Sequence, residues 1–100
     1  MKTIPVPEEK YEKISKLSGV LAHPVRLMIL DVLRQSKELS VEDMRHAFDL
    51  PKANVSRHLA ELRRAGFVKA RRDGRNKIYA LGHPNVDIFC QTLHDLCSAL

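Results

Sequence analysis

The sequence predicts a mainly α-helical fold with one small β-hairpin, and three observations lead to this prediction. Apolar residues recur at helical spacing in five stretches, a strand-turn-strand pattern separates the fourth stretch from the fifth, and Gly or Pro residues lie at several of the breaks. The 100 residues, with 44% apolar and 29% charged side chains, are typical of one globular domain. We therefore expect a single domain over residues 1–100.

Two helices are predicted in the first third of the chain, over residues 8–21 and from Pro24 to about Gln35. In the first, one helical face carries Tyr11, Ile14, Leu17 and Leu21. We expect a surface helix with this single stripe buried. In the second, helical spacing relates Val25, Met28, Ile29, Val32 and Leu33. Pro24 suits a first-turn position, and we expect this helix to lie at the centre of the core.

A helix-turn-helix is predicted next. Ser40 offers a hydroxyl for an N-cap and Asp43 follows three residues later, which indicates a helix that continues to about Phe48. Residues 49–51 break the pattern, and a further helix then runs to a stop at Gly66. The expected buried side of this helix carries Val55, Leu59 and Leu62. Two short helices joined by a tight turn form a helix-turn-helix.

A hairpin and a last helix complete the expected fold. The run FVKARR, the turn pair Asp73 and Gly74, and the run KIYAL are typical of two strands joined by a tight turn. A helix starting at Pro84 or Asn85 then places Val86, Phe89, Cys90, Leu93, Leu96, Cys97 and Leu100 on one side. The expected architecture is a winged helix-turn-helix of five helices with a two-stranded wing.

Positive charge is concentrated in residues 51–80. This stretch holds nine of the seventeen Lys and Arg residues and two acids, so its net charge is +7, against −2 for the other seventy residues. A local excess of this kind indicates a surface that docks on a polyanion. Because the stretch is laid out as a helix followed by a hairpin, we interpret the partner as double-stranded DNA.

The expected DNA contacts come from the helix over residues 52–64 and from the hairpin. With the apolar side of the helix facing the core, Ser56 and Arg57 face outward near its N-terminus, where a recognition helix meets base edges. Arg57 suits guanine and Asn54 suits adenine, whereas the other basic residues suit the backbone or the minor groove. The candidate DNA-binding residues are Lys52, Asn54, Ser56, Arg57, Arg63, Arg64, Arg71, Arg72, Arg75 and Lys77. For His58 we favour a half-buried structural role over base contact.

The stretch from residue 21 to residue 81 resembles the ArsR/SmtB family of bacterial winged-helix repressors. The resemblance is carried by HPVR at His23 to Arg26, SRHL at Ser56 to Leu59, and AGFV at Ala65 to Val68. It implies a homodimer built from the first and last helices, which act as terminal dimerisation helices. It also implies binding to an inverted-repeat operator and release when an effector is sensed. Self-association also suits a chain this short, since a small domain buries a limited share of its surface.

No metal or cofactor is predicted, and the effector is unknown. Many members of the family bind metal through a Cys-x-Cys pair, but Ser40 and Glu42 stand at the corresponding positions here. A second family site uses carboxylates and imidazoles along the last helix. The residues available for it are His83, Asp87, His94 and Asp95, and their spacing does not reproduce that pattern.

Cys90, His94 and Cys97 are the remaining candidates for an effector or redox site. The two cysteines lie seven residues apart, about 10 Å along a helix axis, which is too far for an intrahelical disulfide. If two such helices pair antiparallel across a twofold axis, Cys90 of one chain lies beside Cys97 of the other. These thiols are then placed to bind trivalent arsenic or a soft metal, or to act as a switch by forming a disulfide. The alternative is that both cysteines pack as small apolar side chains.

Other functional classes receive less support from the sequence. No recognisable catalytic triad, phosphate loop or catalytic zinc motif is present, so we do not expect an enzyme. The alternative function is a winged helix that binds RNA or protein without an operator. RNA binding usually displays stacking aromatics, and Phe67 and Tyr79 suit the hairpin core better. The sequence lacks a secretion signal and a run long enough to span a membrane, so we expect a cytoplasmic location and no membrane partner.

Overall fold

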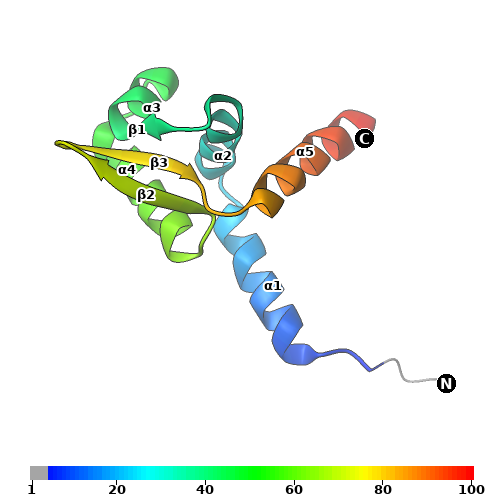
Figure 1. Cartoon of the computed structure of the whole chain (residues 1–100). Coiled ribbons are helices and arrows are strands. Elements are labelled where there is room, and N and C mark those ends of the chain that lie inside the picture. The colour runs from blue at the N-terminus through cyan, green and yellow to red at the C-terminus, as the bar shows by residue number, and fades with distance from the viewer. Residues whose placement is uncertain (1–4) are drawn as a thin grey trace.

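The computed structural model of the chain describes residues 5–100, which form five helices and three strands (Figure 1). The helices are α1 (Glu8–Leu21), α2 (Pro24–Ser36), α3 (Val41–Phe48), α4 (Lys52–Arg64) and α5 (Pro84–Ala99). The strands are β1 (Leu39–Ser40), β2 (Val68–Asp73) and β3 (Asn76–Leu81). The five predicted helices and the predicted hairpin are therefore present, with bounds close to those expected from the sequence.

The hairpin is part of a three-stranded antiparallel sheet, with the strand order β1-β3-β2. The added strand β1 was not predicted, because two residues are too few to show a periodic pattern. Leu39 pairs with Tyr79, and Ser40 pairs with Ile78. Ser40 is also the N-cap of α3, where its hydroxyl accepts from the Asp43 N–H at 3.1 Å and its own N–H donates to the Asp43 carboxylate at 3.1 Å. β1 thus joins the wing directly to the start of the helix-turn-helix.

The apolar core lies between α2, α3, α4 and the sheet (Figure 1). Its buried members are Ile29, Leu30, Leu33, Met44, Val55, Leu59, Leu62, Val68, Tyr79 and Cys90. The predicted buried side of α4 is confirmed. On α2 the buried face is rotated from the predicted one, because Met28 is 44% exposed whereas Leu30 is 1% exposed. The reason is that α5 also packs against α2, on the side that bears Leu30.

Helices α1 and α5 extend away from this core (Figure 1). No residue of α1 is buried, and its stripe residues Tyr11 and Ile14 are 55% and 42% exposed. The prediction of a buried stripe on α1 is therefore wrong for the single chain. Only the end of α1 near α2 and α4 has neighbours, since the rest projects from the body. In α5 the apolar side chains Ile88, Phe89, Leu93 and Leu96 are also exposed.

Candidate nucleic-acid interface

The turn between α3 and α4 sets the direction of α4. Asp49 adopts a left-handed conformation with φ of 52°, and the Leu50 N–H donates to the Arg45 carbonyl at 3.1 Å, which closes α3. Pro51 then precedes the first residue of α4. The apolar side of α4 is buried in the core, and Arg57 is exposed on the opposite side. Lys52, in the first turn, is also exposed, and Ser56 is partly exposed.

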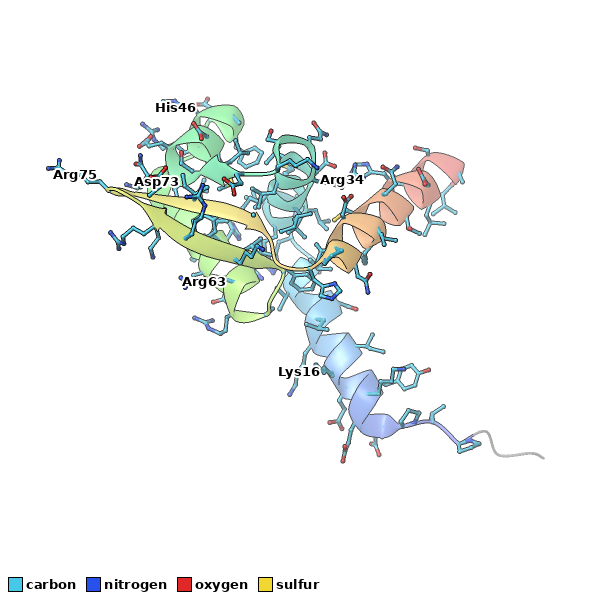
Figure 2. The ribbon with its side chains drawn as sticks, viewed as in Figure 1. Lys16, Arg34, His46, Arg63, Asp73 and Arg75 are labelled. Atoms are coloured by element: carbon cyan, nitrogen blue, oxygen red, sulfur yellow. The ribbon has the colours of Figure 1, made fainter. Side chains whose placement is uncertain are left out.

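The register of the wing decides which basic side chains face α4. Ala70 pairs with Tyr79 and Arg72 pairs with Lys77, so these four side chains lie on one face of the hairpin. Tyr79 on this face is buried, as expected of a residue in the hairpin core. Arg72 and Lys77 therefore lie on the side of the wing that faces α4. Arg75 lies at the tip, next to a turn in which Gly74 has φ of 63° (Figure 2).

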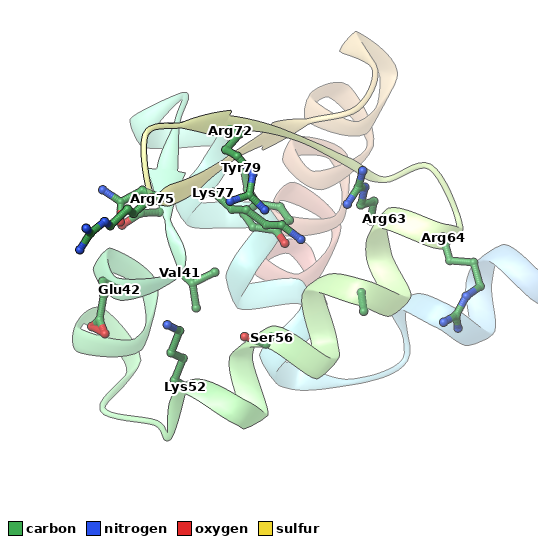
Figure 3. A pocket seen from close by; sticks show the side chains of 13 residues that line it. Val41, Glu42, Lys52, Ser56, Arg63, Arg64, Arg72, Arg75, Lys77 and Tyr79 are labelled. Carbon is green, nitrogen blue, oxygen red and sulfur yellow. The ribbon is translucent and has the colours of Figure 1, made fainter.

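A groove of about 680 Å³ lies between α4, the wing and the start of α3 (Figure 3). We call it the basic groove, and its charged and hydroxyl side chains include Lys52, Ser56, Arg63, Arg64, Arg72, Arg75 and Lys77. Figure 3 shows Lys52 and Ser56 on α4 across from Arg72 and Lys77 on the wing. Six of the lining residues are basic and one, Glu42, is acidic. This arrangement is suited to binding a polyanion between α4 and the wing.

Arg71 does not lie with the other basic candidate residues of the wing. Because side chains alternate along a strand, it lies on the face of the wing opposite Arg72. There it forms an ion pair with Glu38 at 2.7 Å. The hydrogen bond from Arg71 lowers the pKa of the Glu38 carboxyl, and the same bond raises the pKa of the Arg71 guanidinium. Arg71 therefore fastens the wing to the segment before β1, outside the basic groove.

Two other candidates, Asn54 and Arg57, lie on α4 but do not line the basic groove. Arg57 is exposed to solvent and Asn54 is partly exposed. The neighbouring His58 is half-buried, and its Nδ1 accepts a hydrogen bond from Arg26 Nε at 3.1 Å. Burial, and then the charge of Arg26, lower the pKa of His58, so the ring stays neutral and can accept this bond. Arg26 also donates to the Val20 carbonyl at 3.0 Å. This agrees with the structural role expected for His58, which ties α4 to α2 and α1.

The candidate effector residues lie away from the basic groove. Cys90, His94 and Cys97 line a hollow of about 280 Å³ with Leu27 and Leu93. Cys90 is buried, and this burial raises the pKa of its thiol, whereas Cys97 is exposed. His94 Nε2 lies 3.1 Å from Asp31 on α2. Within residues 5–100, no group of three or more His, Cys, Asp or Glu side chains is placed to hold a metal ion.

Glu42 is the acidic residue that lines the basic groove, and the sequence analysis did not assign it to the DNA-binding surface. Its carboxylate pairs with Arg45 at 2.9 Å and lies 3.6 Å from His46 Nε2. The spacing of three and four residues within α3 indicates these two contacts from the sequence. It does not indicate that Glu42 also faces α4, because that depends on how the two helices are packed.

Comparisons with known proteins identify the family of this fold. The helix-turn-helix domain family matches residues 21–71. The HTH-type transcriptional repressor SmtB of Mycobacterium tuberculosis is 38% identical over 77 residues, which are 77% of this chain and 56% of that protein. The chain belongs to the ArsR/SmtB family. It is therefore a DNA-binding transcriptional regulator, and the resemblance stated from the sequence is confirmed.

Two solved structures of similar proteins support the winged helix-turn-helix fold of this ArsR/SmtB member. Reduced HlyU from Vibrio cholerae has a TM-score of 0.81 and 34% identity, and the match covers 89% of this chain and 93% of HlyU. The homodimeric DNA-binding domain of Mb0332 from Mycobacterium bovis, a possible ArsR-family regulator, has a TM-score of 0.83 and 25% identity. That match covers 98% of this chain and 91% of the Mb0332 domain. Over residues 5–100, no helix is long and apolar enough to cross a membrane.

Proposed function

We propose that the protein is a homodimeric repressor that binds an inverted-repeat operator through α4 and the wing. The observation that carries this proposal is the basic groove, which is lined by six basic side chains from α4 and the wing. A duplex carries a phosphate about every 1.7 Å along its axis, so such a face gains affinity by releasing condensed counterions. Sequence choice then depends on the side chains that reach base edges.

The proposed roles of the DNA-binding residues follow from their placement. Ser56 and Arg57, near the N-terminus of α4, contact base edges, and Asn54 reaches adenine if it turns toward the major groove. The basic residues of the groove contact the phosphate backbone: Lys52, Arg63, Arg64, Arg72, Arg75 and Lys77. We assign no DNA contact to Arg71, since it is engaged by Glu38 on the other face of the wing.

The proposed dimer uses the apolar faces of α1 and α5. Large apolar side chains are exposed on both helices, and they include Tyr11, Ile14, Ile88, Phe89, Leu93 and Leu96. Exposed apolar side chains gathered on one helix in this way usually mark an interface. The Mb0332 domain, which matches nearly the whole chain, is itself homodimeric. Two α4 helices related by a twofold axis then read two half-sites of opposite orientation.

Arg57→Ala tests the assignment of base and backbone contacts. The variant is expected to lose about 1–3 kcal/mol of affinity for an operator selected from random duplexes and to relax its base preference, because a bidentate contact to guanine is lost. Arg72→Gln combined with Lys77→Gln is expected to weaken binding to all duplexes and to lower the salt slope by about one unit for each lost contact. Fluorescence anisotropy at several salt concentrations measures both effects.

Lys16→Gln on α1 is the matched control, since Lys16 lies far from the basic groove (Figure 2). It should leave the affinity and the salt slope unchanged. An equal loss on operator and random DNA would make Arg57 a backbone contact. Efficient competition by single-stranded RNA would instead favour an RNA-binding module and overturn operator binding.

We further propose that modification of the thiols releases the operator. Cys97, exposed in the single chain, lines the same hollow as the buried Cys90, so modification of these thiols would disturb the proposed α5 interface. Peroxide or arsenite should weaken operator binding by the protein, and the Cys90→Ser, Cys97→Ser double variant should lose this response. If the double variant responds like the original protein, the thiols serve packing alone.

A further inference from the structure

A second hollow lies on the face of the wing opposite the basic groove. It has a volume of about 380 Å³ and is enclosed by the end of α2, by β2, and by the junction of β3 with α5. Its charged or titratable lining residues are Arg34, Lys37, Glu38, Lys69, His83 and Asp87. We call it the outer hollow. Its size is within the range of sites for small molecules.

The two acids of the outer hollow already have cationic neighbours. Glu38 is held by Arg71 at 2.7 Å, and Asp87 Oδ1 lies 3.9 Å from Arg34 Nε. The pKa of Glu38 is lowered first by its bond from Arg71 and to a smaller extent by the charge of Lys69. By contrast, no carboxylate within residues 5–100 forms an ion pair with Lys37 or Lys69. The hollow therefore has two ammonium groups whose charge is not matched by a paired carboxylate.

Two further donors border the outer hollow. Arg34 bonds to Gln91 and Asp31 through its terminal nitrogens, but its buried Nε has no acceptor within residues 5–100. In Figure 2 its side chain lies between α2 and α5. His83 accepts from the Asn85 N–H at its Nδ1, so the neutral ring carries its proton on Nε2 and can donate there. Donors therefore come from α2, β2 and the start of α5.

The backbone at Lys37 is strained. Lys37 has φ of 70° and ψ of −51°, and the Glu38 N–H donates to the Ser36 carbonyl at 2.8 Å, so Lys37 is the central residue of a γ-turn with positive φ. This turn is rare for a residue with a side chain, and glycine would adopt it with less strain. Strained backbone of this kind clusters at functional sites, and Lys37 also lines the outer hollow.

The geometry points to the outer hollow as a binding site for a small anion, namely the phosphate or carboxylate group of a low-molecular-weight ligand, held by Lys37 and Lys69. Such a ligand lies between the wing and α5, on the side of the wing away from the basic groove. The site goes beyond the proposed DNA binding and does not depend on it, because its occupancy is measured without DNA.

Titration with inorganic phosphate at constant ionic strength, followed by amide chemical shifts of the full chain, tests this site. Saturable shifts are expected at Lys37, Lys69, Gly82 and His83, with a single dissociation constant. Lys37→Ala and Lys69→Gln should each weaken this binding about tenfold, since each removes a charge-assisted hydrogen bond. Lys16→Gln is the control and should leave the dissociation constant unchanged.

Glycine variants separate the strain at Lys37 from its role in binding. Lys37→Gly should raise the melting temperature by about 4–8 °C through relief of strain, and should weaken phosphate binding as Lys37→Ala does. Asp49→Gly is the matched control, because Asp49 also has positive φ but lies on the turn between α3 and α4. It should also raise the melting temperature but leave phosphate binding unchanged.

Three results would overturn the site. The first is that phosphate shifts only the amides of the basic groove, such as Ser56 and Lys77. The second is that Lys37→Gly and Lys69→Gln bind phosphate as the original chain does. The third is that Lys69→Gln lowers affinity for duplex DNA in phosphate-free buffer as much as Lys77→Gln does, which would make this face a DNA contact instead.

Discussion

Replacing Leu93 by glutamate is expected to convert the proposed dimer to a monomer and to weaken binding to the proposed inverted-repeat operator by about 10²–10⁴-fold. Leu93 lies on α5, is 38% exposed in the single chain, and lines the hollow that also contains both cysteines. A carboxylate buried there in the proposed dimer interface would lose its hydration, and this cost would disfavour association. The monomer would then lose the gain in affinity that comes from binding two half-sites at once.

Ser98→Glu provides a matched control for the charge itself. Ser98 is exposed on the same helix but lies about 140° around its axis from Leu93. This variant should stay dimeric by analytical ultracentrifugation and should keep its operator affinity. A Leu93→Glu variant that remains dimeric would show that α5 does not form the interface. A monomeric variant that still binds the full operator tightly would show that two half-sites are not read together.

The helix-turn-helix could be predicted from the sequence because its signals are local. The capping box of Ser40 and Asp43 marks the start of α3, and it is present in the structure. Gly66, which follows the C-cap residue Ala65 of α4, has φ of 90°, as expected of a glycine that ends a helix. The apolar spacing of α4 then fixes which side is buried. These features depend on neighbouring residues, so the sequence alone is sufficient to find them.

The placement of Arg71 shows where the sequence analysis was incomplete. Val68 and Ala70 are apolar at alternate positions of β2, and this pattern already indicates that Arg72 shares their face and that Arg71 lies on the other. The prediction grouped Arg71 with Arg72 because both are basic, and it did not use this alternation. The ion pair with Glu38 is a different case, since it joins residues 33 apart in sequence and follows only from the packed wing.

Other features depend on elements that no local pattern specifies. The apolar stripe of α1 is predicted to be buried because its spacing is that of an amphipathic helix. Most of α1, however, has no neighbour in the single chain. Amphipathic spacing shows that a face needs a partner but does not say whether the same chain supplies it. The outer hollow likewise joins residues of α2, β2 and α5 that are far apart in sequence.

Leu59→Ala is expected to lower the free energy of unfolding by about 2–5 kcal/mol, because it leaves a cavity at a fully buried position of α4. A domain of this size is stabilised by only about 5–15 kcal/mol, so the loss is a large fraction of the total. Leu59 is flanked by His58, which ties α4 to Arg26, and it packs in the same core as Val55 and Leu62. Denaturant unfolding followed by circular dichroism measures the change.

The volume-conserving variant Leu59→Met separates the cavity from other effects of the substitution. It should cost less than about 1.5 kcal/mol, since methionine nearly refills the space that leucine occupies. If both variants lose the same stability, the shape of leucine matters more than the volume it fills. A small loss in both would mean that α4 is not anchored by this core. The basic groove would then have no rigid support on its helical side, because Leu59 anchors the helix that carries Lys52, Ser56 and Arg63.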